Sequence, residues 1–161
     1  MTTPLNGGCL CGHIRYQLRT EARDAYFCHC RMCQLAFGHI SAPFLNIKKT
    51  ELTWMTNPPV FYASSRFAER GFCPRCGTPL TFAFRDSAQI DISVGSLDDP
   101  DATRPTKHVG VETRVQGWHH PDGLPEARLE DNEQVMQRWR DAYGEDVVPG
   151  VKTARSRTGR P

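Results

Sequence analysis

The chain has 161 residues, of which 24% are charged, and its formal net charge is +2 at pH 7. This length suits one domain of ordinary size that can bury a core of its own. The near balance of charges gives no basic stripe of the kind that nucleic-acid binders carry, and no apolar run approaches the ~20 residues that cross a bilayer.

The chain begins MTTPLNGG, which has neither the basic nor the apolar segment of a secretory leader. We therefore expect a cytoplasmic protein whose thiols are reduced. Its seven cysteines form three clusters, at Cys9 and Cys11, at Cys28, Cys30 and Cys33, and at Cys73 and Cys76. An odd count without a leader argues against a disulfide framework.

The first cluster lies in a segment expected to be extended. Residues i and i+2 of such a segment point to the same side, so Cys9 and Cys11 can offer two sulfurs to one ion. Gly12 follows at once and can adopt the positive φ that turns the backbone. This pair is typical of a zinc knuckle.

The middle cluster places three thiols within six residues and has no such glycine. The run from Cys30 to Phe37, ended by Gly38, predicts a short helix with Cys30 and Cys33 on one side of its start.

The third cluster, Cys73-Pro74-Arg75-Cys76, has the spacing of a redox dithiol. Gly77 and a strand-like segment come after it, whereas a redox motif normally opens a helix, so a second zinc knuckle is favoured. Apolar stretches rich in strand-forming residues surround these clusters and predict a mainly β fold. They run over 13–18, 40–47, 52–55, 60–63, 80–84 and 90–94.

The pattern changes after Pro125. Helix-forming residues with one apolar stripe predict a C-terminal helix over 126–144, with Gly144 as its stop, packed back on the sheet. The last stretch, 145–161, is expected to be a disordered basic tail. All four of its cations follow residue 151, in a segment that has no acidic residue and almost nothing apolar. Nucleic acid is an unlikely partner because only this tail is basic.

Seven thiols divide naturally into four and three. A structural zinc site is closed by four protein ligands, whereas a catalytic one keeps a position open. We favour the two knuckles sharing one ion and the triplet holding another. The sequence also allows Cys9, Cys11, Cys28 and Cys30 to form the tetrad, and allows a histidine to complete the second site. The candidate histidines are His29, His39, His108, His119 and His120.

The runs GGCLCGHIRY, CHCRMCQLAFG, RGFCPRCGTPLTF and ISVGSLDDP, followed by a late histidine and Gly-Trp, resemble the family of glutathione-dependent formaldehyde-activating enzymes, which includes centromere protein V. The resemblance covers Leu5 to Leu124 and all seven cysteine positions. It implies a zinc-binding domain over 5–125, a folded sheet of the β-tent type, and two zinc ions per chain. By position, it implies a structural zinc at Cys9, Cys11, Cys73 and Cys76 and a catalytic zinc at Cys28, Cys30 and Cys33.

Three thiolates around a divalent cation suit a thiol as the fourth ligand, and a thiol ionises on coordination. Because a thiolate attacks an aldehyde carbonyl, we expect a carbon–sulfur lyase that makes and cleaves thiol–aldehyde adducts. The resemblance implies glutathione and formaldehyde as the pair, with S-(hydroxymethyl)glutathione as the adduct. Candidate cations for the glutathione carboxylates are Lys48, Lys49, Arg66 and Arg70.

Two alternatives use the same thiols. The zinc ions could instead serve folding alone, in a scaffold that binds a protein or, through the tail, a nucleic acid. The triplet could also act as a redox sensor that releases zinc on oxidation. The oligomeric state does not follow from the sequence.

Overall fold

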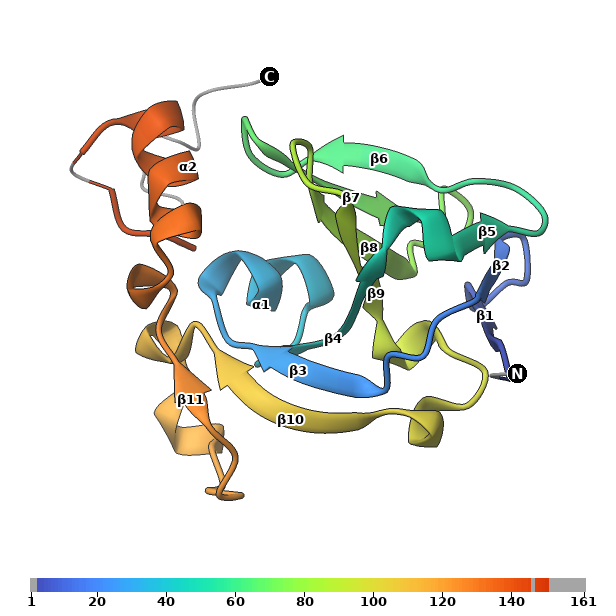
Figure 1. The fold of residues 1–161 in the computed structure, drawn as a ribbon, viewed down its shortest axis with the longest axis horizontal. Coiled ribbons are helices and arrows are strands. Elements are labelled where there is room, and N and C mark those ends of the chain that lie inside the picture. Colours follow the sequence, from blue (N-terminus) through green and yellow to red (C-terminus); the bar gives the residue numbers. More distant parts are fainter. Residues whose placement is uncertain (1–2, 146, 151–161) are drawn as a thin grey trace. The chain divides into compact units, whose positions relative to one another are not determined.

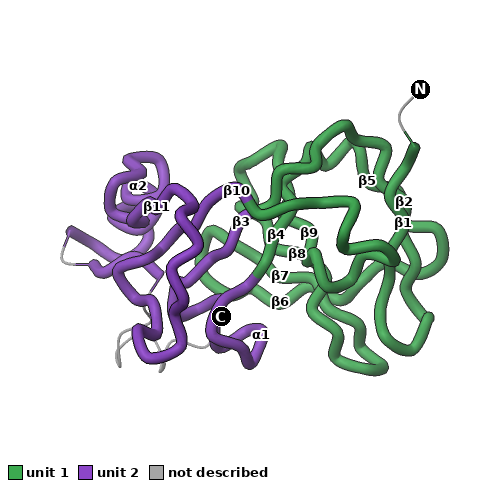
Figure 2. Tube along the Cα trace, turned by 90° about the horizontal axis from the view of Figure 1, so that it is seen from below, with its two compact units in different colours: residues 1–25, 43–105 green, residues 26–42, 106–161 purple. Residues whose placement is uncertain are grey.

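The computed structural model describes residues 3–145 and 147–150. Within them the fold is mainly β, with one short helix, α1 (Arg31–Phe37), and one C-terminal helix, α2 (Glu133–Tyr143) (Figure 1). This confirms the predicted fold class. The contacts divide the chain into two units, residues 1–25 with 43–105 and residues 26–42 with 106–161 (Figure 2).

Unit 1 contains two sets of antiparallel strands. One is a three-stranded sheet in the order β1-β2-β5, made of β1 (Leu5–Gly8), β2 (Arg15–Leu18) and β5 (Leu52–Trp54). In the other, neighbouring strands run in the order β4-β9-β8-β7-β6. Their bounds are β4 (Ala42–Lys48), β6 (Val60–Ala63), β7 (Ala68–Phe72), β8 (Pro79–Phe84) and β9 (Gln89–Ser93). The first residue of β4, Ala42, belongs to unit 2.

The hydrophobic core of unit 1 is formed by residues that point inward from these strands. Leu18, Leu45, Leu80 and Ile92 are completely buried in it. Cys73 is equally buried and belongs to the same cluster, together with Cys9. Two of the knuckle cysteines are therefore part of the core that stabilises unit 1.

Unit 2 contains the strands β3 (Asp24–Cys28), β10 (Arg104–Val109) and β11 (Glu126–Ala127), in the order β11-β10-β3. The first two residues of β3 and of β10 belong to unit 1. Helix α1 follows β3: the Cys33 amide donates to the Cys30 sulfur at its start, and Gly38 ends it with φ of 60°. The predicted short helix is confirmed, because a left-handed glycine terminates it as expected.

The C-terminal helix begins later than the sequence indicated. Glu126 and Ala127 form β11, which pairs in parallel with His108 and Val109, and a 3-10 turn follows. Helix α2 starts only after Asn132, whose side chain accepts a hydrogen bond from the Val135 amide. An asparagine in that position satisfies a free amide of the first turn and so fixes the start of the helix.

The remaining regular segments are single 3-10 turns, at Lys49–Glu51, Val94–Ser96, Pro100–Ala102, Val111–Thr113, Gln116–Trp118 and Leu129–Asp131. Neither α-helix of the described residues has the length and apolar character that a membrane span requires. The predicted domain boundaries at 125 and 144, and the packing of the C-terminal helix on the sheet, stay predictions. Most of the predicted tail, residues 146 and 151–161, lies outside the described residues.

Candidate metal centres

Four cysteines of unit 1 converge on one point. The sulfurs of Cys9, Cys11, Cys73 and Cys76 all lie within 4.8 Å of one another, although Cys11 and Cys73 are 62 positions apart in the chain. Both knuckle glycines have positive φ, 74° at Gly12 and 75° at Gly77. The turns that the sequence predicted after each pair are therefore present. The expected extended segment is not: Cys9 and Cys11 lie in the turn that follows β1, where the amide of Gly12 donates to the Cys9 carbonyl at 3.0 Å, so the turn and not strand alternation brings their sulfurs together.

The spacing of these sulfurs fits a tetrahedral ion. The sulfur of Cys11 lies 3.6 Å from that of Cys9 and 3.8 Å from that of Cys73, far beyond the length of a disulfide bond. Metal–sulfur bonds of about 2.3 Å in a tetrahedron place the sulfurs about 3.8 Å apart. In addition, the amide of Ile14 donates to the Cys9 sulfur at 3.2 Å, which stabilises negative charge there.

One thiol of this group is prepared for ionisation. The hydroxyl of Thr78 lies 3.1 Å from the Cys76 sulfur. That hydrogen bond, followed by the one from the backbone of Thr78, lowers the pKa of Cys76 to about 5. A thiolate is the form that binds a metal, so the chemistry of this set suits a cation.

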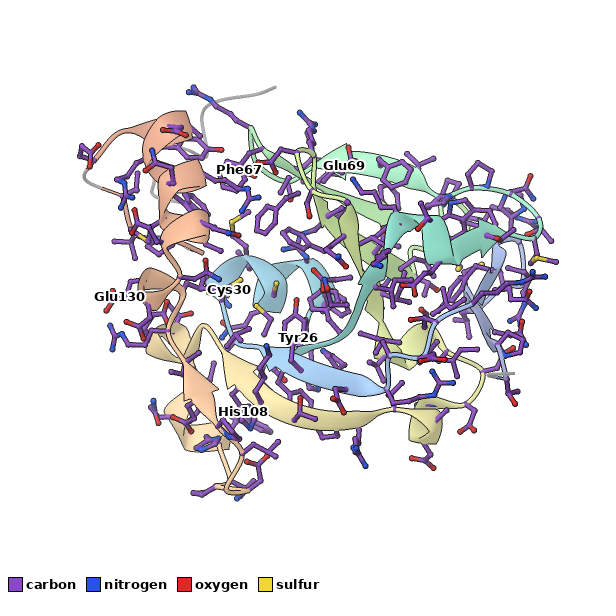
Figure 3. All side chains as sticks on the ribbon, in the orientation of Figure 1. Tyr26, Cys30, Phe67, Glu69, His108 and Glu130 are labelled. Carbon is purple, nitrogen blue, oxygen red and sulfur yellow. The ribbon has the colours of Figure 1, made fainter. Side chains whose placement is uncertain are left out.

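The triplet forms a second, separate group within unit 2. The sulfurs of Cys28, Cys30 and Cys33 also lie within 4.8 Å of one another, and all three residues are buried. Cys28 ends β3, Cys30 precedes α1 and Cys33 lies in the first turn of α1. Cys30 is labelled at the start of α1 in Figure 3. The sulfurs thus group four and three, as in the favoured allocation, and the roles of the two groups stay predictions.

No fourth ligand joins the triplet from the described residues. None of their histidines, aspartates or glutamates belongs to the group. His29 lies between two of the cysteines, but its Nε2 is 2.7 Å from Nδ1 of His108 instead. The triplet therefore offers three sulfurs, and the described residues leave the fourth tetrahedral position unfilled.

The triplet disfavours the thiolate form of its cysteines unless a positive charge lies beside them. Contact of the Cys28 sulfur with Cys30 and then Cys33, followed by burial, raises the pKa of Cys28 well above its usual value. A bound cation reverses this preference, because it neutralises thiolates that burial and mutual repulsion disfavour. Three buried sulfurs held this close therefore fit a metal ion.

A buried polar cluster adjoins the triplet in unit 2. His29 and His108 are both buried, and burial followed by the positive charge of Arg114 lowers the pKa of His29 to about 4. Arg114 is itself largely buried and donates to Glu126 at 2.7 Å and to Nε2 of His119 at 3.1 Å. Because of Arg114, the pKa of Glu126 lies below its usual value.

The cations considered for glutathione all lie in unit 1, whereas the triplet lies in unit 2. Arg70 is buried in β7, with its guanidinium 4.8 Å from the centre of the Phe82 ring. The ammonium of Lys49 lies 3.4 Å from the carbonyl oxygen of Phe84. Their assignment to a substrate stays a prediction.

The family model described as "Glutathione-dependent formaldehyde-activating enzyme" matches residues 4–113, more than half of the chain. The chain belongs to this family. The match contains all seven cysteines and therefore both sulfur groups. The resemblance inferred from the sequence motifs is confirmed.

Two individual proteins are similar to this family member. An uncharacterized lyase of Schizosaccharomyces pombe is 40% identical over 80 residues, which are 48% of this chain and 56% of that protein. The chain thus matches little more than half of that relative's length. The crystal structure of a Rhodobacter sphaeroides protein aligns with a TM-score of 0.47 and 19% identity, over 76% of this chain and 98% of that one.

Sequence reasoning treated His29 and His108 only as candidate ligands and did not consider Asp122 at all. In the structure, the ring of His108 links His29 to the carboxylate of Asp122. His29 and His108 are 79 positions apart, so no local spacing could have indicated this contact.

Proposed function

We propose that this protein is a zinc-dependent carbon–sulfur lyase that forms and cleaves thiol–aldehyde adducts. In this proposal Cys9, Cys11, Cys73 and Cys76 hold a structural zinc. Cys28, Cys30 and Cys33 hold a catalytic zinc. Membership of the glutathione-dependent formaldehyde-activating family supports the reaction class.

The observation that carries the proposal is the difference between the two sulfur groups. One has four thiols, two of them within the core of unit 1, and is closed. The other has three and gains no further ligand from the described residues. Closed sites stabilise folds, whereas three protein ligands with an open position are typical of catalytic zinc.

Zinc bound to three thiolates supplies an electron-rich Lewis acid that holds an incoming thiol as its thiolate. The protein's own part is to present the three sulfurs from the end of β3 and the start of α1, where Cys30 caps the helix and Cys33 lies in its first turn. All three cysteines are buried, and a soft sulfur ligand suits thiolate-bound zinc in the remaining position.

In the synthetic direction the substrate sulfur attacks the carbonyl carbon of the aldehyde. The C–S bond forms as the carbonyl π pair moves to oxygen, and that oxygen takes up the proton that the thiol released. Cleavage is the reverse, so no oxidant or reductant is consumed. The adduct also forms without a catalyst, which means that the enzyme contributes proximity and an ionised thiol.

Within this class we propose glutathione as the thiol and formaldehyde as the aldehyde, with S-(hydroxymethyl)glutathione as the adduct. The family description supports this pair. The cytoplasm is the compartment that suits it, because thiols are kept reduced there.

The test compares two buried cysteines, one from each group, in Cys33→Ser and Cys73→Ser. A structural zinc contributes about 10 kcal/mol or more, comparable with the whole stability of a domain, so Cys73→Ser is expected to unfold. Cys33→Ser should keep its unfolding transition, bind one zinc fewer and lose adduct formation. Metal analysis, thermal unfolding and the rate of adduct formation measure these outcomes. If Cys33→Ser unfolds like Cys73→Ser, or stays active, the catalytic role of the triplet is wrong.

Zinc X-ray absorption tests the open position without any need to know the aldehyde. One four-sulfur site and one three-sulfur site average about 3.5 sulfurs per zinc, and saturating glutathione should raise the average to about 4. A value of 4 before the thiol is added, unchanged afterwards, would favour the scaffold alternative.

A further inference from the structure

A hydrogen-bonded chain runs from the protein surface to the loop that carries the triplet. The carboxylate of Asp122 is half exposed and lies 3.0 Å from Nε2 of His108. Nδ1 of His108 lies 2.7 Å from Nε2 of His29, and both rings are buried. The ring of Phe27 stacks on His108 with a centroid distance of 5.3 Å, which restricts the rotation of that ring. Figure 3 labels His108 on β10.

The carboxylate determines the direction of this chain. An ionised carboxylate can only accept, so Nε2 of a neutral His108 carries the proton that it donates to Asp122. Nδ1 of His108 is then an acceptor, and Nε2 of His29 must donate to it. Neutral His29 therefore carries no proton on Nδ1.

The backbone of His29 is held as firmly as its ring. Its amide donates to the Val109 carbonyl at 2.8 Å. Its carbonyl accepts from Nε2 of Gln34 at 2.8 Å and from the hydroxyl of Thr113 at 3.0 Å. Since Cys28 and Cys30 are the chain neighbours of His29, a fixed backbone at His29 restricts where both of their sulfurs can lie.

We propose that Asp122 and His108 are positioning residues, which hold His29 and through it the cysteine triplet in one arrangement. The inference rests on the proposed function only in that the triplet binds a metal. Outer partners of this kind fix ligand orientation, and their loss typically weakens metal binding by 10-fold or more. This accounts for the burial of the His29 and His108 rings, neither of which belongs to a candidate metal group of the described residues.

The direction of the chain is tested by Asp122→Asn in the zinc-loaded protein. This variant keeps Oδ1, which accepts from the Leu124 amide at 3.0 Å and lies 3.2 Å from Nε2 of His108, but it removes the negative charge and replaces the nearer oxygen by an NH₂ group. Nε2 of His108 then faces a donor at the nearer position and an acceptor at the farther one, so the direction of the chain is no longer imposed. Nitrogen-15 shifts of the imidazoles should show neutral His29 protonated at Nε2 alone in the unaltered protein and as a mixture of both tautomers in the variant.

A purely space-filling role of the histidines would leave those tautomers unchanged in Asp122→Asn, and this result would overturn the proposal. So would a His108 that is protonated at Nδ1, or at both nitrogens, in the unaltered protein. Neither readout depends on lyase activity, so failure of the proposed reaction and failure of this inference are distinguishable.

Metal retention tests the effect on the triplet. His108→Gln should weaken binding of cobalt(II), which reports thiolate coordination by its charge-transfer band, by about tenfold at one of the two sites. His120→Gln is the matched control, because His120 is an exposed histidine of the same segment. Equal affinity in the two variants would refute the positioning role. If His108→Gln does not fold, the tautomer measurement in Asp122→Asn still decides the question.

Discussion

Gly110 lies where an added methyl group would press on the triplet, which makes Gly110→Ala a direct test of how tightly the cysteines are held. Its φ is 68°, and a Cβ at this position would lie 3.0 Å from the amide nitrogen of Cys30 and 3.3 Å from its Cβ. Both neighbours belong to the cap of α1, which has little room to move. Gly123→Ala is the matched control: its φ is 77°, but no atom lies within 4 Å of the added Cβ.

This pair of variants distinguishes two contributions to the loss of folding free energy. The left-handed backbone disfavours alanine by roughly 1–2 kcal/mol at either position. Only Gly110→Ala adds the crowding of Cys30, for which overpacking of a buried site typically costs about 1–3 kcal/mol. In a chain of this size each 1 kcal/mol lowers the melting temperature by about 2–4 °C, so the excess destabilisation of Gly110→Ala is measurable.

Thermal unfolding of both metal-loaded variants, combined with metal analysis after mild chelation, provides the assay. Gly110→Ala should melt at a lower temperature than Gly123→Ala. It should also lose metal to the chelator more readily than Gly123→Ala does. If the two variants melt together and retain metal equally, Cys30 is not confined by Gly110, and the tight placement of the triplet inferred from these distances is incorrect.

Two further predictions concern buried polar groups. Burial raises the pKa of Tyr16 to about 12, so the unfolded chain ionises first and stability should fall by about 2 kcal/mol as pH rises from 10 to 12. Tyr16→Phe should lack this loss of stability at alkaline pH, although it also loses the 2.7 Å hydrogen bond with Ser96. If denaturant titrations show the same decrease in stability with pH for Tyr16→Phe and for the unaltered protein, the prediction is wrong. Gln34 donates hydrogen bonds to the carbonyls of His29 and Thr113. Urea unfolding of Gln34→Ala should therefore show a free energy of unfolding lower by about 1–3 kcal/mol. A decrease below roughly 0.5 kcal/mol, the level of a neutral surface change, would show that these hydrogen bonds are dispensable.

Sequence patterns located the strands with regular apolar content. The expected strand over 60–63 coincides with β6, and that over 80–84 with all of β8 except its first residue. Strands β1 and β7 were missed because each contains glycine, which has low strand propensity. The structure supplies the reason: a Cβ at Gly7 would lie 2.3 Å from the Tyr16 hydroxyl, and one at Gly71 would lie 2.4 Å from the Thr81 hydroxyl.

Local patterns also failed at the start of the C-terminal helix. Helix-forming residues extend back to Glu126, but Glu126 and Ala127 pair with β10. A strand partner more than ten residues away satisfies their backbone groups, and the cap at Asn132 then determines where helical hydrogen bonding begins. Propensity reports neither of these constraints.

The sequence by itself determined the family, the two knuckles and the compact triplet, because each depends on residues within a few positions of one another. Spacing of two or three residues keeps the sulfurs of one cluster close together, and a following glycine permits the turn. Only the tertiary structure decided that Cys9 and Cys11 meet Cys73 and Cys76, that no histidine of the described residues joins the triplet, and that Asp122 and His108 secure His29. Those relations depend on how distant strands pair and pack, and no local pattern carries that information.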